Sequence, residues 1–174
     1  MSGIPPEQES VLAEIGMALL SVQHTESLLR FTLRYPLSGP KGVTLETLER
    51  SETALKKNTL GQFLRVLKDR VDLDDEFGLA LDRFLNARNV FAHRLDDVPG
   101  WDLRSKEGRD AAHVFLTELI RSATFISKVL TGLMRSWARQ NNMDVPPAPG
   151  EESLFAEIDA LYTTKVDSIF FAKE

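Results

Sequence analysis

The sequence predicts an all-α fold, an antiparallel bundle of about four to five helices followed by a short C-terminal helix. Apolar residues recur at three- and four-residue steps over long stretches, which is the spacing of one helix face. No stretch stands out with the alternating pattern of a strand, and without cysteines there is no disulfide framework. We expect the bundle to occupy residues 1–143, and a Pro-containing acidic linker with a short amphipathic helix to occupy 144–174.

The first helix is predicted over residues 7–33, and a loop rich in proline and glycine follows at 35–42. One row of apolar residues on this helix comprises Val11, Ile15, Leu19, Val22, Leu29 and Leu33. Glu26 interrupts that row as its one acid. A carboxylate among apolar residues calls for a partner, because a buried charge is costly unless it is paired.

Two middle helices are predicted next, a short one over 45–56 and another from residue 60 to about 71. Thr59 and Gln62 have the spacing of a capping box at the start of the second one. The acidic cluster at 72–76 suits the positive end of the following helix dipole.

The helix predicted over residues 75–95 combines an apolar row with a polar one. The apolar row comprises Phe77, Leu81, Phe84, Phe91 and Leu95, and Arg88 occupies its missing position. The neighbouring row comprises Asp82, Asn86, Asn89 and His93. An arginine inside an apolar stripe, beside a polar edge, indicates that stability has been given up for another purpose.

A turn at 98–101 precedes a long helix predicted over 106–139, with a continuous apolar row. Three prolines mark the linker at 141–150, and a short amphipathic helix is predicted over 152–162.

Charge is divided unevenly along the chain, whose net charge is -5. From residue 144 onward, seven acids stand against Lys165 and Lys173, so this tail carries the whole net charge. Residues 50–70 are locally basic, which permits a phosphate-binding surface. No apolar run approaches the ~20 residues of a membrane span, and the first residues lack the pattern of a signal peptide. We therefore expect a cytoplasmic protein without a membrane partner.

The segment from Asn86 to Arg94 resembles the signature of the HEPN domain (higher eukaryotes and prokaryotes nucleotide-binding). It contains an arginine, four residues and then a histidine, with asparagine directly after the arginine and alanine before the histidine. In outline the resemblance extends over residues 7–139, with a long first helix, middle helices that carry the motif and a long helix after it. It implies a HEPN-like bundle.

The resemblance also implies a function, because catalytic members of the family are metal-independent RNA endonucleases that act as homodimers, and many are toxins or anti-phage effectors. By position, Arg88 and His93 would be the catalytic pair and Asn89 the polar residue that accompanies them. We expect RNA as substrate, no cofactor or metal, and a cognate antitoxin or regulator as a candidate partner.

The residue types fit this chemistry without the family name. Histidine titrates near neutral pH and can move the proton of a ribose 2′-hydroxyl, while arginine can stabilise a phosphorane. Five positions apart on a helix, Arg88 and His93 point about 140° from each other, so a two-fold dimer would have to complete the site. Glu26 and Asn86 are supporting candidates.

Additional RNA contacts are expected from four basic residues, namely Lys56, Lys57, Arg65 and Arg94. His24 and His113 lack the spacing of metal ligands, so we expect ordinary surface or packing roles for them.

Two alternatives stay open. One is a non-catalytic module of the same fold that binds a nucleotide or a protein. The other is a structural dimerisation protein in which Arg88 forms a buried ion pair with Glu26.

Overall fold

A computed structural model describes residues 5–37 and 60–172 of the chain. The described part is predominantly helical, which confirms the all-α prediction. Its α-helices are α1 (Pro6–Arg34), α3 (Leu60–Arg70), α4 (Asp75–His93), α5 (Lys106–Gln140), α6 (Glu152–Leu161) and α7 (Val166–Ile169). Its other elements are the strands β1 (Val71–Leu73) and β2 (Phe170–Ala172) and the 3-10 turns η1 (Leu95–Asp97) and η2 (Thr163–Lys165). The helix predicted over 45–56, and Thr59 of the predicted capping box, lie outside the described residues.

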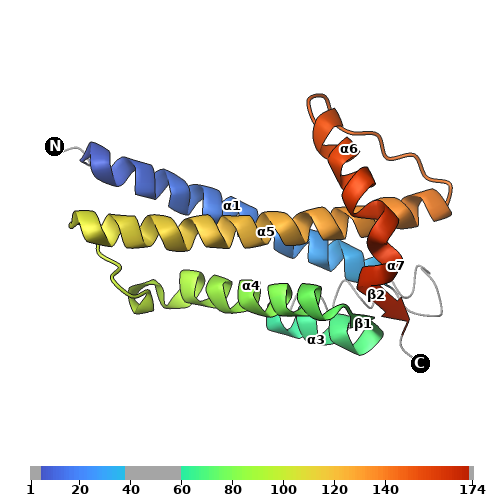
Figure 1. The fold of residues 1–174 in the computed structure, drawn as a ribbon, viewed down its shortest axis with the longest axis horizontal. Helices are drawn as coiled ribbons and strands as arrows, with labels where there is room; N and C mark the ends of the chain where they lie inside the picture. Colours follow the sequence, from blue (N-terminus) through green and yellow to red (C-terminus); the bar gives the residue numbers. More distant parts are fainter. Residues whose placement is uncertain (1–4, 38–59, 173–174) are drawn as a thin grey trace.

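The long helix α5 forms the centre of the fold, with α1 packed along it on one side and α4 on the other (Figure 1). A buried hydrogen-bond cluster joins α1 to α5. Thr25 Oγ1 lies 2.9 Å from Ser127 Oγ and 3.2 Å from the carbonyl oxygen of Ala123. Because Thr25 is almost fully buried, these bonds fix the register of the two helices where water cannot replace them.

The hydrophobic core is formed mainly by facing sides of α1, α4 and α5. On α1 the buried row is Val11, Ala18, Val22, Thr25, Leu29, Thr32 and Leu33. The prediction that Leu19 belongs to this row is wrong, because its side chain is 47% exposed. Ala18 takes its place against α5, where the two helices approach closely and a small side chain fits.

Both ends of α4 have local causes. Its N-cap, Asp74, accepts hydrogen bonds from the backbone amides of Glu76 and Phe77. The helix ends at His93, two residues before the predicted end, because Arg94 has φ -146° and ψ 42° and so leaves the helical conformation.

The structure contains two short strands, β1 and β2, which the sequence did not predict. β1 pairs with β2 in antiparallel register, Val71 opposite Ala172 and Leu73 opposite Phe170. Phe170 is buried against Phe77, with ring centroids 5.5 Å apart, so the pair is held by the core as well as by its own ladder. Each strand has three residues, which is too short for an alternating pattern to be visible in the sequence.

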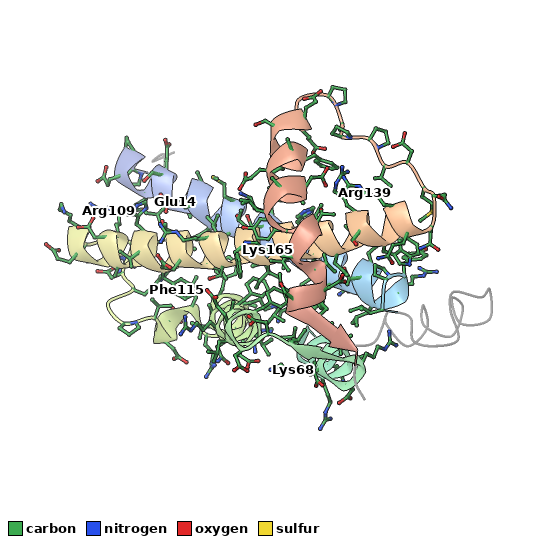
Figure 2. All side chains as sticks on the ribbon, turned by 45° about the vertical axis from the view of Figure 1, so that its right-hand side comes forward. Glu14, Lys68, Arg109, Phe115, Arg139 and Lys165 are labelled. Atoms are coloured by element: carbon green, nitrogen blue, oxygen red, sulfur yellow. The ribbon has the colours of Figure 1, made fainter. Side chains whose placement is uncertain are left out.

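The chain after α5 folds back onto that helix, as Figures 1 and 2 show. Asp159 of α6 accepts hydrogen bonds of 2.7 Å from Nε and Nη2 of Arg135, and one of 2.6 Å from Arg139. The buried side chains of Ile158 and Val166 add apolar contact.

No helix in residues 5–37 and 60–172 has both the length and the apolar character that crossing a bilayer requires.

Candidate active site

Arg88 lies on α4 and reaches across to α1. Its Nε donates a 2.8 Å hydrogen bond to Glu26 Oε1, so the two residues that interrupt apolar rows in the sequence contact each other. Its Nη1 donates a longer bond of 3.3 Å to Asn89 Oδ1. Among the described residues nothing hydrogen-bonds to its third nitrogen, Nη2. The guanidinium is therefore held from one side by a carboxylate and an amide.

This ion pair is only partly shielded from solvent. The side chains of Arg88 and Glu26 are 22% and 15% exposed. Glu26 also approaches a second cation, with its Oε2 3.8 Å from Arg30 Nη2 one helical turn further along α1. Two arginines thus approach one carboxylate, one from α4 and one from α1.

His93 is the last residue of α4 and is exposed to solvent. In the part of the chain that the structure describes, no side chain forms a hydrogen bond or ion pair with its ring.

The rest of the polar row on α4 faces solvent to different degrees. Asn86 is exposed and Asn89 is half-buried. Asp82 is engaged elsewhere, because its two carboxylate oxygens accept hydrogen bonds of 2.8 and 2.9 Å from Lys68 of α3. The row therefore forms a largely solvent-facing edge of the helix, and Asp82 at its start forms an ion pair with Lys68.

The basic residues proposed to contact RNA are placed unevenly. Lys56 and Lys57 lie outside the described residues, and Arg65 is exposed on α3. Arg94 is exposed directly after α4, with its Nε 3.9 Å from Asp97 Oδ2. The basic stretch also supplies a structural residue: Nη1 of Arg70 donates hydrogen bonds to the carbonyl oxygens of Leu33 and Leu37 at the end of α1. Burial lowers the pKa of Arg70.

The structure thus brings Glu26, Arg88 and Asn89 into contact but gives no contact between Arg88 and His93. Both residues belong to the continuous helix α4, so the angle of about 140° between their side-chain directions follows from helix geometry. One chain alone therefore makes a poor site for a single phosphate. Within the described residues, no group of three or more His, Asp or Glu side chains has the proximity needed to hold a metal ion.

A second feature was missed by sequence reasoning, namely an apolar groove between the C-terminal halves of α1 and α5. It has a volume of about 590 Å³ and is lined by residues that include His24, Phe31, Tyr35 and Trp137. Its signal in the sequence is a second apolar row on α1, opposite the core row. That row contains Met17, Leu20 and Phe31, which are 58%, 67% and 43% exposed, with His24 between them; of these four, His24 and Phe31 line the groove.

Comparison of the chain with protein-family models, with curated proteins and with solved structures finds no match.

Proposed function

We propose that this protein is a metal-independent endoribonuclease of the HEPN type, in which Arg88, Asn89 and His93 act on RNA. The observation that supports the proposal is the geometry of Arg88. Glu26 and Asn89 hold its Nε and Nη1, while the Nη2 edge has no partner among the described residues. An exposed histidine stands five residues further along the same helix. This combination provides a fixed cation for a phosphate and a titratable group for a proton.

The reaction follows from these roles. His93 accepts the proton of the ribose 2′-hydroxyl, whose oxygen attacks the adjacent phosphorus. Arg88 donates hydrogen bonds to the phosphoryl oxygens as negative charge accumulates on the phosphorane. The bond between phosphorus and the 5′-oxygen breaks, and that oxygen takes up a proton. The products are a 2′,3′-cyclic phosphate and a 5′-hydroxyl.

A two-fold dimer would complete the site, because it can direct Arg88 of one protomer and His93 of its partner at one phosphate. Exposed Asn86 and Arg94 lie along the same helix and its end, where the RNA backbone would pass. Lys56, Lys57 and Arg65 would extend this contact.

The biological role that the family resemblance suggests is that of a cytoplasmic toxin or anti-phage effector, restrained by a cognate antitoxin or regulator. These assignments rest on the resemblance alone and belong to the same proposal.

The test is RNA cleavage by the purified wild-type chain and by Arg88→Ala and His93→Ala variants, with Arg83→Ala as a matched control. Arg83 is an exposed arginine of the same helix. We expect the first two variants to be inactive and the control to retain activity. Mixing the two inactive variants should restore up to about a quarter of the wild-type rate, since half of randomly formed dimers carry one intact composite site. Equal activity of all variants would contradict the assignment.

The alternative function is a non-catalytic module of the same fold that binds a nucleotide or a protein. The 590 Å³ apolar groove favours binding as one of the activities of this chain. Binding of RNA without cleavage over a broad panel of sequences would support this alternative.

A further inference from the structure

The solvent-facing side of α1 is apolar over most of its length. Five of the large hydrophobic residues that are exposed in residues 5–37 and 60–172 lie on this helix, namely Leu12, Met17, Leu19, Leu20 and Phe31. Between Ser10 and Ser27, no exposed residue of α1 is an acid, a lysine or an arginine. A long uncharged face with several exposed apolar side chains is typical of a surface that another molecule covers.

The middle of this face is a stripe of exposed residues that follow one another at steps of three and four. These five residues, called the α1 stripe below, are Ala13, Gly16, Leu20, Gln23 and Ser27. Alternating steps of three and four are the spacing at which two helices pack along each other in a coiled coil. Leu20, at the centre of the stripe, is 67% exposed, and the small side chains around it allow a second helix to approach closely.

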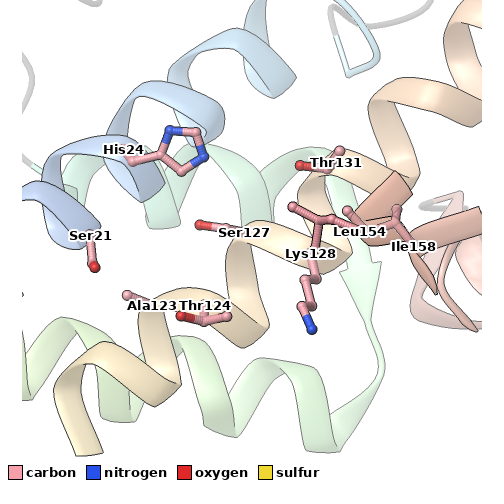
Figure 3. Close-up of a pocket in the computed structure, with 9 residues that line it drawn as sticks. All are labelled: Ser21, His24, Ala123, Thr124, Ser127, Lys128, Thr131, Leu154 and Ile158. Carbon is pink, nitrogen blue, oxygen red and sulfur yellow. The ribbon is translucent and has the colours of Figure 1, made fainter. Parts of the chain in front are cut away.

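The α1 stripe is separate from the hollows and from the candidate active site. It lies opposite the buried row of α1, since Leu20 and the core residue Val22 are about 160° apart on the helix. Figure 3 shows the small hollow of about 200 Å³ on another side of α1, where Ser21 and His24 face Ser127 of α5. The helix α4 lies across α5 from α1 (Figure 1). A molecule that covers the stripe therefore approaches from outside the bundle.

The charges towards the two ends of α1 indicate which molecule fits. Glu7 and Glu9 are exposed in the first turn, and the side chain of Arg30 is 49% exposed near the other end, where it also approaches Glu26. Leu20 lies midway, eleven residues after Glu9 and ten before Arg30. A helix with an acidic end, an uncharged middle and a basic end is complementary to a second copy of itself that runs in the opposite direction.

We propose that two copies of this chain associate through the α1 stripe, with their α1 helices antiparallel and a two-fold axis at Leu20. In this arrangement Leu20 packs on Leu20 of the second copy, Ala13 lies opposite Ser27, and Glu9 comes next to Arg30. The antiparallel direction also brings helix ends of opposite partial charge together. Parallel pairing would instead place acids against acids and Arg30 against Arg30.

Other occupants fit the α1 stripe less well. Helices that lie on a membrane surface carry lysine and arginine beside their apolar face, whereas residues 6–29 contain neither. The first half of α1 has three acids, Glu7, Glu9 and Glu14, which anionic lipids repel. A helix of another protein would have to present a basic and then an acidic end around an uncharged middle, which a second copy of α1 supplies by symmetry alone.

This inference goes beyond the proposed function, which requires a two-fold dimer but does not place its interface. Because α4 lies across α5 from α1, the contact at the α1 stripe is separate from one that would join Arg88 and His93 of two chains. If both contacts form with closed symmetry, the assembly is a tetramer. Each contact can therefore be tested without the other.

Light scattering coupled to size-exclusion chromatography tests the interface. We expect the wild-type chain to have the mass of a dimer, or of a tetramer if both contacts form. Leu20→Glu and Leu20→Lys each place two like charges at the axis, and each should raise the dissociation constant at least a hundredfold and halve the mass. An equal mixture of the two should restore the assembly, because opposite charges then meet. Leu79→Glu is the matched control, since Leu79 is a 56% exposed leucine of α4.

Disulfide cross-linking tests the direction of the two helices. The sequence contains no cysteine, so a single introduced cysteine is unique. Antiparallel pairing at Leu20 predicts that Ala13→Cys and Ser27→Cys form a disulfide with each other when mixed, and that neither variant cross-links efficiently with itself. Parallel pairing predicts the reverse. Thermal melts verify that every variant folds.

The outcomes separate this proposal from the ribonuclease proposal. A monomeric wild-type chain, an assembly that Leu20→Glu leaves intact, or self-cross-linking of Ala13→Cys would overturn the interface. A dimer that depends on Leu20 but cuts no RNA would support the interface and count against the proposed function. Cleavage of RNA by an assembly that is insensitive to both substitutions of Leu20 would support the function and overturn the interface.

Discussion

Arg88 and Glu26, 62 residues apart in the sequence, are joined by a 2.8 Å hydrogen bond between α4 and α1. The contact uses the inner nitrogen of the guanidinium, Nε, and so leaves the outer edge of Arg88 directed away from Glu26. The same ion pair therefore links two helices and orients a cation, and substitutions can separate these two effects.

Removal of the Glu26 carboxylate should destabilise the fold. In Glu26→Ala, the guanidinium of Arg88, whose side chain is 22% exposed, loses its charged partner, and we expect the free energy of unfolding to fall by about 1–3 kcal/mol. Glu26→Gln retains an acceptor and should cost less. Urea denaturation measures both. Glu14→Ala is the matched control, because Glu14 of the same helix pairs with the exposed His113 and should contribute under about 1 kcal/mol. Equal losses for Glu14→Ala and Glu26→Ala would contradict the account.

The hydrogen-bond cluster between α1 and α5 should be sensitive to a change that preserves shape. Thr25→Val keeps the volume of the side chain but removes the hydroxyl that contacts Ser21, Ala123 and Ser127. We expect a loss of about 1–2 kcal/mol, because Ser127 Oγ and the Ala123 carbonyl oxygen lose this buried partner. Chemical denaturation of Thr25→Val beside Ser27→Ala, a solvent-facing residue of the same helix, measures the effect. A stability of Thr25→Val equal to that of the wild type would show that the cluster is not important for packing.

Acid should weaken the attachment of α6 to α5, because it protonates Asp159. The hydrogen bonds from Arg135, above all, lower the pKa of Asp159 to about 2 from 3.8. Because this pKa is lower in the folded state, the stabilisation is present above pH 4 and is lost as the pH falls from about 4 towards 2. The shift corresponds to about 2 kcal/mol. Asp159→Asn should lose this amount at pH 7 and should differ little from the wild type near pH 2. Thermal melts across this range would contradict the account if the difference between the two proteins were independent of pH.

Gly132 should tolerate no side chain, because the chain after α6 passes directly over it. A Cβ at this position would lie 2.8 Å from Tyr162 Cβ and 3.1 Å from the backbone nitrogen of Thr163. Gly132→Ala should therefore cost about 1–3 kcal/mol and expose the segment from residue 162 onward to proteolysis. Gly16→Ala, where nothing lies within 4 Å, should instead stabilise α1 by about 0.5–1 kcal/mol. Equal protease resistance of Gly132→Ala and the wild type would contradict the packing of η2 on α5.

The sequence predicted best those features that repeat within one helix. The long helices, and the partnership of Glu26 with Arg88, could be predicted because each residue is the exception in an apolar row of helical period. Leu19 was assigned wrongly because α1 carries apolar residues on two sides, and a row that contains Leu19 fits the helical period as well as one that contains Ala18. Only the position of α5 decides between the two rows.

Features that leave no periodic pattern in the local sequence could not be predicted. The strand β2 pairs with β1 across about a hundred residues, and three residues give no period to recognise. The apolar groove requires that residues after α5 fold back so that Phe155 comes near Phe31 and Trp137. Nothing in the local sequence of α1 specifies that return.

Cleavage of two matched RNA oligonucleotides in excess chelator tests the central claim most directly. One has ordinary ribose throughout, and the other carries 2′-O-methyl groups, which remove the nucleophile. The account predicts that the wild-type chain cuts only the first and leaves 2′,3′-cyclic phosphate and 5′-hydroxyl ends, and that Arg88→Ala and His93→Ala, both still folded, cut neither. Cleavage of both oligonucleotides, cleavage that the two variants retain, or no cleavage of any RNA in a broad panel would contradict it.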